Sequence, residues 1–217
     1  MLHWLSCGLG TFAALLCTCA AAATVDVRIV DSAGAPAANA VVSLMPDENG
    51  AAIAARTPRQ SVIDQRHETF LPLVVIVRKG GRVIFTNNDT TMHQVYSFSP
   101  IKQFEFEIDR GRTSTPVVFD KAGVAAIGCN IHDNMVAFVY VADAPIAVIT
   151  DEEGKARIED VPEGAYHVAV WHPQLRIGRR PAPSALNVGA HAVSFSATLP
   201  LLQSAMPAMS HMHMSDY

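Results

Sequence analysis

The fold is indicated most clearly by residues 123–141, GVAAIGCNIHDNMVAFVYV, in which two apolar segments flank a short polar loop. The second segment, Met135–Val141, is short and rich in valine, as expected for a buried β-strand. The first segment, Gly123–Cys129, leads directly into the loop. The loop region carries three side chains that can bind a metal, in the spacing C-x-x-H-x-x-M: Cys129, His132 and Met135. These residues predict two strands joined by a loop with metal-binding potential.

The rest of the chain shows the same alternation of short apolar segments and turns. Val25, Val27 and Ile29 alternate with polar residues, which is the period of a strand with one buried face. Turn residues at 79–81 and 87–89 separate neighbouring segments. Further strands are expected at Val41–Met45, Leu73–Val77, Arg82–Thr86, Val95–Phe98, Phe104–Ile108, Thr115–Phe119, Ala147–Thr150, Ala156–Ile158, Tyr166–Trp171 and Val193–Leu199. Because no long helical periodicity follows the N-terminal segment, we predict an all-β protein of the sandwich or barrel type.

Composition narrows the possible functions. The chain has 217 residues, of which 50% are hydrophobic and 17% charged, so it can bury a substantial core in one or two domains. These values exclude a disordered polyelectrolyte. The net charge of −4 provides no cationic surface for nucleic acid, so we expect no nucleic-acid partner.

Residues 1–23 have the pattern of an export signal. They contain no Lys, Arg, Asp or Glu, and the apolar run Leu9–Cys19 is followed by the small residues Ala20–Ala23. The run is too short to cross a bilayer comfortably, which favours a signal cleaved near Ala23 over a retained membrane anchor. We therefore expect a periplasmic or otherwise exported protein whose mature chain is not stably inserted in a membrane.

The signal changes how the cysteines are interpreted. Three of the four, Cys7, Cys17 and Cys19, lie within residues 1–23, and only Cys129 follows them. An exported protein with a single cysteine cannot form an internal disulfide. A buried apolar role and metal binding are both open to Cys129.

An upstream histidine completes a ligand set for copper. His93 follows a strand and an Asn/Asp turn in residues 83–95, VIFTNNDTTMHQV. Taken singly, His93 could be a turn residue and Met135 a core residue. Taken together, one thiolate, two imidazoles and a thioether suit a single copper ion that alternates between Cu(I) and Cu(II). The candidate metal ligands are His93, Cys129, His132 and Met135.

Other chemistries fit the sequence less well. A zinc site could use Cys129 and two histidines, but methionine is a poor zinc ligand and no H-E-x-x-H motif supplies a general base. A binuclear copper centre would need a second cysteine on the loop. No sequence pattern of a catalytic triad, a phosphate-binding glycine loop or a carboxylate pair stands out.

The two metal-binding motifs resemble those of the cupredoxins. The pattern V-x-F-x-N-x-D-x-x-x-H-x-V at residues 83–95 is similar to that family, the loop has the spacing of amicyanin, and the wider chain resembles cupredoxin-like methylamine-utilisation proteins. The resemblance covers residues 60–143 and implies a Greek-key sandwich with a type 1-like (blue copper) site. It also implies that His132 is the route for electrons, where a redox protein partner docks. Gln94 stands where the family commonly has Asn, and Asp133 stands beside the loop histidine where amicyanin has Pro.

The flanking regions resemble a different sandwich. The pattern D-x-x-G-x-P-x-x-x-A at residues 31–40, with TDEEGK and VPEGAY within residues 150–166, is similar to the carboxypeptidase regulatory-like, transthyretin-like family, in which the two halves are contiguous. We therefore expect a cupredoxin sandwich inserted into a second, transthyretin-like β-sandwich. The expected divisions are a signal peptide (1–23), the first part of the outer sandwich (24–59), the cupredoxin domain (60–143), the second part of the outer sandwich (144–199) and a flexible tail (200–217).

The expected function is that of an electron carrier rather than an enzyme, since four protein ligands leave no open position for a substrate. The alternative is a copper chaperone or sensor, suggested by His211 and His213 in the methionine-containing tail. A structural or adhesive protein with a decayed copper site is a third possibility. Two further groups of residues are not expected to bind a ligand. Aromatic packing is expected for His167, Trp171 and His172. A solvated basic cluster is expected for Arg176, Arg179 and Arg180.

Overall fold

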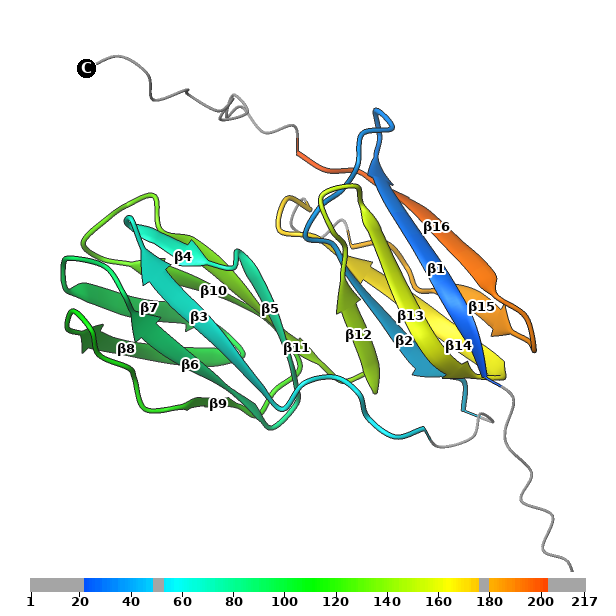
Figure 1. Ribbon diagram of the computed structural model, residues 1–217, viewed down its shortest axis with the longest axis horizontal. Coiled ribbons are helices and arrows are strands. Elements are labelled where there is room, and N and C mark those ends of the chain that lie inside the picture. Colours follow the sequence, from blue (N-terminus) through cyan, green and yellow to red (C-terminus); the bar gives the residue numbers. More distant parts are fainter. Residues whose placement is uncertain (1–21, 49–52, 176–179, 203–217) are drawn as a thin grey trace, which may run out of the picture.

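The computed structural model describes residues 22–48, 53–175 and 180–202 (Figure 1). These residues form sixteen β-strands and no helix, which confirms the all-β prediction. The described residues therefore contain no helix that could cross a membrane. Most of the predicted export signal and the tail from residue 203 onward lie outside the described ranges.

One pair of sheets is built from the two ends of the chain (Figure 1). Its strands are β1 (Ala22–Asp31), β2 (Val41–Pro46), β12 (Ile146–Ile149), β13 (Lys155–Pro162), β14 (Gly164–Trp171), β15 (Ser184–Val188) and β16 (Val193–Leu199). They form a three-stranded sheet in the order β13-β1-β16 and a four-stranded sheet in the order β12-β2-β14-β15. Buried side chains such as Val25, Leu44 and Val168 belong to the core between these sheets.

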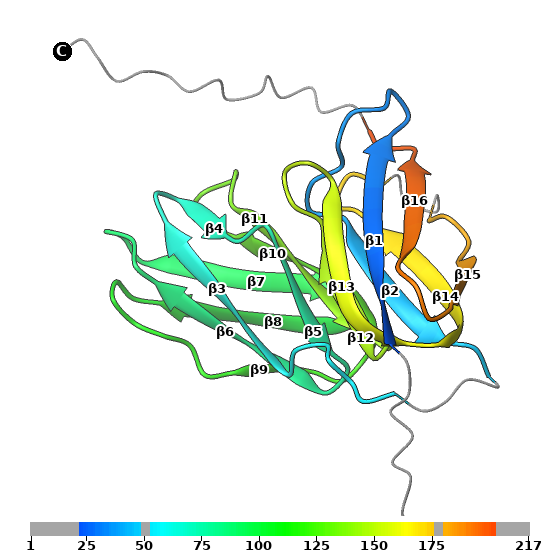
Figure 2. The same ribbon diagram turned by 45° about the vertical axis from the view of Figure 1, so that its right-hand side comes forward.

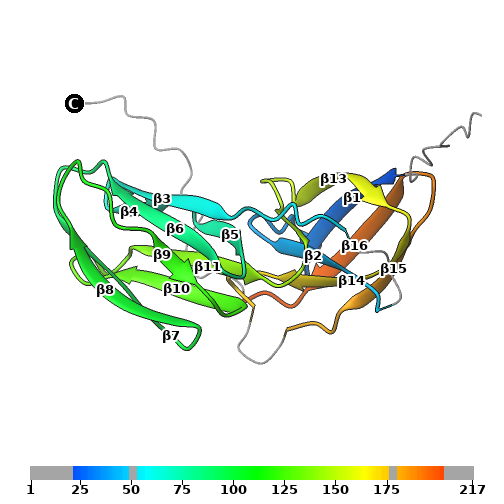
Figure 3. The same ribbon diagram turned by 90° about the horizontal axis from the view of Figure 1, so that it is seen from below.

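The other pair of sheets is built from the intervening chain (Figures 2 and 3). Its strands are β3 (Gln60–Arg66), β4 (Thr69–Leu71), β5 (Val74–Arg78), β6 (Gly81–Asn87), β7 (His93–Ser99), β8 (Lys102–Ile108), β9 (Val117–Phe119), β10 (Gly123–Cys129) and β11 (Val136–Ala142). A five-stranded sheet has the order β5-β11-β10-β7-β8, and a four-stranded sheet has the order β4-β3-β6-β9. Their shared core includes Phe85, Phe119 and Ile127. The candidate ligands of the metal lie in this second sandwich.

Local sequence explains how these strands form. In β1, Val25, Val27 and Ile29 are buried while their neighbours are more exposed, as the alternation predicts. The tight turn between β5 and β6 depends on glycine, because Gly80 has a φ of 76°. At Gly81 a Cβ atom would lie 2.7 Å from the carbonyl oxygen of Arg78, too close for any side chain.

A third apolar cluster joins the two sandwiches. Val41 of β2 is buried together with Val74 of β5 and Tyr140 of β11. Trp171 of β14 packs against Phe138 and Tyr140, with ring centroids 5.7 and 5.8 Å apart. Figure 1 shows β5, β11 and β12 where the two pairs of sheets meet. The predicted aromatic packing of Trp171 is therefore directed across the junction between the sandwiches.

Three strands escape prediction from the sequence, namely β3, β4 and β15. In β3 the buried positions are Ile63 and Gln65, and an inward-facing glutamine conceals the hydrophobic period. Strand β4 has only three residues, and only two residues of β15 are buried. At the N-terminus, β1 begins at Ala22, and Ala23 pairs with Val161, so the last two residues of the predicted signal belong to a strand. The signal itself stays a prediction.

Candidate metal centre

Three of the four predicted ligands come together at one end of the second sandwich. His93 is the first residue of β7, Cys129 is the last residue of β10, and His132 lies in the loop that leads to β11. Strands β7 and β10 are neighbours in the five-stranded sheet, with Cys129 opposite Val95. As a result, one potential ligand atom from each of His93, Cys129 and His132 lies within 4.8 Å of the others.

The thiol and the first imidazole meet in the core. The Sγ atom of Cys129 lies 3.7 Å from Nδ1 of His93, and both residues are buried, with exposed fractions of 4% and 0%. The main-chain N–H of Ile131 points to the same sulfur at 3.5 Å. The sulfur is therefore in contact with a main-chain donor as well as with an imidazole.

The outer nitrogen of His93 is held by a carboxylate. Nε2 of His93 lies 3.1 Å from Oδ2 of Asp89, whose side chain is only 7% exposed. The main-chain N–H of Glu68 donates to the same oxygen at 2.7 Å and is the main reason why the pKa of Asp89 falls from 3.8 to about 2. Burial opposes this shift, and the contact with His93 adds to it. An ionised Asp89 accepts a hydrogen bond from Nε2, which leaves the Nδ1 lone pair facing Cys129.

The second imidazole has a buried nitrogen that lacks a partner among the described residues. Within these ranges Nδ1 of His132 is buried without a hydrogen bond, whereas its Nε2 lies 3.4 Å from Oε1 of Glu68. Leaving a buried acceptor unpaired costs about 1–3 kcal/mol, so such atoms call for an explanation. The centroids of the His93 and His132 rings are 5.1 Å apart, so a metal ion held by these two residues and Cys129 would provide the missing partner. The donor set therefore fits a metal ion.

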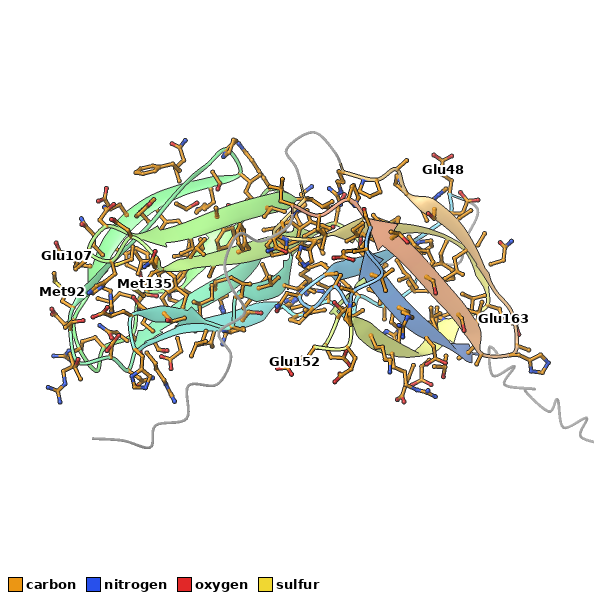
Figure 4. The ribbon with its side chains drawn as sticks, turned by 90° about the horizontal axis from the view of Figure 1, so that it is seen from above. Glu48, Met92, Glu107, Met135, Glu152 and Glu163 are labelled. Carbon is orange, nitrogen blue, oxygen red and sulfur yellow. The ribbon has the colours of Figure 1, made fainter. Side chains whose placement is uncertain are left out.

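The fourth predicted ligand, Met135, is buried beside the site. Its exposed fraction is 2%, and it belongs to the same apolar cluster as Cys129. Its main-chain N–H donates to the carbonyl oxygen of His132 at 3.1 Å, which closes the loop. Figure 4 shows Met135 near the end of the sandwich that is remote from the other pair of sheets. Its role as a ligand stays a prediction.

The loop that carries Cys129 and His132 is fastened through Glu105, a residue that no sequence motif identifies. The main-chain N–H of Asn130 donates to the carbonyl oxygen of Gln94 at 3.1 Å. The side chains of Gln94 and Asn130 both donate to Oε1 of Glu105, at 2.8 and 2.9 Å. Gln94 thus ties down the loop through its main chain and, by way of a carboxylate on β8, through its side chain.

The turn before His93 is held by a buried amide. Asn87 is 1% exposed, and its Nδ2 donates to the carbonyl oxygens of Thr91 and Ile108, both at 2.8 Å. Its Oδ1 accepts from the main-chain N–H of Asp89 at 2.9 Å. These bonds fix residues 87–93 in the arrangement that presents both Asp89 and His93 to the site.

The other residues named from the sequence lie elsewhere. His172 is buried in the first sandwich, where its Nε2 contacts the carbonyl oxygen of Ala38 at 2.8 Å and burial lowers its pKa. His167 is exposed and lies 3.3 Å from Asp47, and Arg180 donates to the hydroxyl of Tyr140 at 2.9 Å. A further set lies outside the described residues: Arg176, Arg179, His211 and His213.

Comparison with known proteins finds similarity in solved structures alone. No family model matches the chain, and no curated protein matches it. Part of the chain is similar to a "Novel Purple Cupredoxin from Nitrosopumilus maritimus", with 23% identity, a TM-score of 0.35, and coverage of 38% of this chain and 99% of that chain. Amicyanin from Paracoccus versutus (Thiobacillus versutus) is 20% identical with a TM-score of 0.35, over 46% of this chain and 98% of that chain.

An enzyme is also among these structures. The copper-containing nitrite reductase NirK from Thermus scotoductus SA-01 is 21% identical with a TM-score of 0.36, over 46% of this chain and 25% of that chain. Each likeness covers less than half of this chain at low identity. The inference of a metal site therefore rests on the arrangement of His93, Cys129 and His132 itself.

Proposed function

We propose that this protein binds one copper ion through His93, Cys129, His132 and Met135. The observation that carries the proposal is the group of one thiol and two imidazoles, in which the buried Nδ1 of His132 has no hydrogen-bond partner in the described part of the chain. A thiolate with two imidazoles is the donor set of blue-copper sites, and a thioether is their usual weak axial ligand. Zinc accepts the same thiol and imidazoles but gains little from a methionine.

We further propose that the bound ion serves electron transfer and not catalysis. Copper in such a site alternates between Cu(I) and Cu(II), so it can accept and release one electron. The protein surrounds the site with apolar side chains and places a carboxylate beside the outer nitrogen of each histidine, which favours a similar arrangement in both states. Four protein ligands leave no open position for a substrate.

The edge of the site at His132 is where a redox protein partner is proposed to dock. The side chain of His132 is 22% exposed, so it links the buried donors to the surface. Exposed apolar side chains lie next to ligands in the sequence, with Ile131 at 44% and Met92 at 39%. A small apolar surface around a ligand suits a transient redox encounter. The proposed location is the periplasm or another exported compartment, as the predicted signal implies.

The test compares matched variants of the mature protein loaded with Cu(II). Wild type is expected to show an intense visible thiolate-to-copper absorption, and Cys129→Ala is expected to lose it. His167→Gln, an exposed histidine of the other sandwich, serves as the control and is expected to keep it. An absorption that survives Cys129→Ala would rule out this site as its source.

The alternative function, a copper chaperone or sensor, makes a different prediction. A carrier of electrons keeps its metal, whereas a chaperone passes it to an acceptor. Deleting residues 210–217 and measuring copper transfer to an acceptor separates the two. The electron-carrier proposal predicts electron exchange without copper release, whether or not the tail is present.

A further inference from the structure

The hairpin between β3 and β4 has a turn whose conformation its residues do not favour. Arg66 pairs with Thr69, and the two residues between them, His67 and Glu68, have φ values of 49° and 54°. A two-residue turn with positive φ at both central positions usually carries Asn-Gly or a similar pair. Residues with larger side chains are strained in this region. A turn with this sequence therefore points to a role beyond chain reversal.

Glu68 makes two contacts with the candidate metal centre from this position. Its main-chain N–H donates to Oδ2 of Asp89 at 2.7 Å, and Asp89 in turn lies 3.1 Å from Nε2 of His93. Its carboxylate oxygen Oε1 lies 3.4 Å from Nε2 of His132. One residue thus reaches the outer nitrogens of both candidate histidine ligands, directly in one case and through Asp89 in the other.

We propose that Glu68 is a positioning residue for the metal centre and that the strained turn persists because it delivers Glu68 there. This inference rests on the proposed copper site. A carboxylate close to Nε2 favours the tautomer of His132 that carries its hydrogen on this nitrogen, which leaves Nδ1 free to bind the metal. The main-chain contact does the same for His93 by orienting Asp89.

The charge of Glu68 has a second consequence. A negative charge close to His132 stabilises the more positive oxidation state of a bound ion, and so lowers the reduction potential. Because the Glu68 side chain is 60% exposed, water and salt weaken this effect. The effect on potential should therefore diminish as ionic strength rises.

Two substitutions test the side chain of Glu68, and both keep its main-chain donor to Asp89. Glu68→Gln keeps the size of the side chain and removes its charge. Glu68→Gly removes the side chain, keeps the main-chain donor to Asp89, and relieves the strained φ. Glu107→Gln is the matched control, because Glu107 is an exposed carboxylate of β8 at the same end of the sandwich (Figure 4).

The measurements are copper affinity, reduction potential and the unfolding temperature of the metal-free protein. Loss of an outer contact to a ligand typically weakens metal binding by about 10- to 100-fold. We expect that loss in Glu68→Gly, a smaller loss with a more positive potential in Glu68→Gln, and no change in Glu107→Gln. Without metal, Glu68→Gly is expected to unfold at a higher temperature than wild type, since glycine suits the turn.

The outcomes that overturn the inference differ from those that overturn the function. If wild type binds copper normally, and both Glu68 variants match it in affinity and potential, the side chain of Glu68 does not position His132 and the inference fails. A lower unfolding temperature of metal-free Glu68→Gly would also overturn the inference, because the turn would then not be strained. If wild type takes up no copper, the proposed function fails first and the positioning role fails with it.

Discussion

The Sγ atom of Cys129 lies 3.7 Å from Nδ1 of His93 inside a closed apolar core. The two atoms are brought together by adjacent strands of one sheet, β10 and β7, and not by a mobile loop. His132 reaches the same point from the loop, and its outer nitrogen lies beside Glu68 on a separate hairpin. The donors are therefore fixed by sheet pairing and by carboxylate contacts before a metal binds.

Removing the tie between the ligand loop and β8 should loosen the metal. In Glu105→Ala, both Gln94 and Asn130 lose their shared acceptor, so we expect copper binding to weaken by about 10-fold. Glu107→Ala removes a neighbouring carboxylate on the same exposed face of β8 and should bind copper as wild type does. Competition with a copper chelator measures the copper affinity of both variants. Equal affinities in the two variants would contradict the role of Glu105.

At Gly128, an added side chain would clash with a neighbouring aromatic ring. Gly128 directly precedes Cys129, and a Cβ atom on Gly128 would lie 2.5 Å from Cζ of Tyr96. Gly128→Ala should force the tyrosine ring to move and destabilise the fold by about 1–3 kcal/mol. Gly189→Ala is the control, because in the described residues, apart from its own chain neighbours, no atom lies within 4 Å of the added Cβ. Denaturant unfolding compares them, and adding Tyr96→Ala to Gly128→Ala should remove the clash.

Acid should weaken the fold partly through Asp64. Burial raises the pKa of this carboxyl, but hydrogen bonds from Thr86, Asn88 and Arg66 outweigh burial and leave the pKa below 3.8. Because the pKa is lower in the folded state, the ionised carboxylate stabilises the fold above pH 3.8, and this contribution disappears as the pH falls through the lowered pKa. Free energies of unfolding of wild type and Asp64→Asn should therefore differ at neutral pH and converge in acid. A gap that stays constant from pH 7 to acid would contradict this assignment.

The aromatic contacts between the sandwiches should couple their unfolding. Trp171→Ala removes the ring that packs on Phe138 and Tyr140, and the loss should be on the order of 3 kcal/mol. We expect a single calorimetric transition in wild type to separate into two in this variant. Trp171→Phe keeps an aromatic ring and should retain most of the coupling. Two transitions already present in wild type would mean that the junction does not couple the sandwiches.

The sequence is sufficient to propose the candidate ligands because their chemistry is uncommon and their spacing is short. A single cysteine outside the predicted signal, a histidine three residues later and a histidine after a turn define most of the site. The all-β class follows from alternation in strands such as β1, where Val25, Val27 and Ile29 face the core.

The surroundings of the site could not be predicted in the same way. Strand β3 escapes detection because its inward face contains Gln65, which is fully buried. The hairpin that follows it delivers Glu68 to Asp89, 21 residues away in sequence, and to His132 on the ligand loop. Contacts of this kind depend on which sheets face each other, and neither periodicity nor a local motif contains that information. The same holds for Glu105, which looks like an ordinary exposed residue of a strand.

Titration of the metal-free mature protein with Cu(II), followed by visible absorption, tests the central claim most directly. A thiolate and two imidazoles bound to one copper ion should give an intense absorption that grows linearly and stops at one equivalent of copper. The account predicts this end point, with loss of colour on reduction. A colourless complex at saturation, or no uptake at one equivalent, would contradict a blue-copper site at His93, Cys129 and His132.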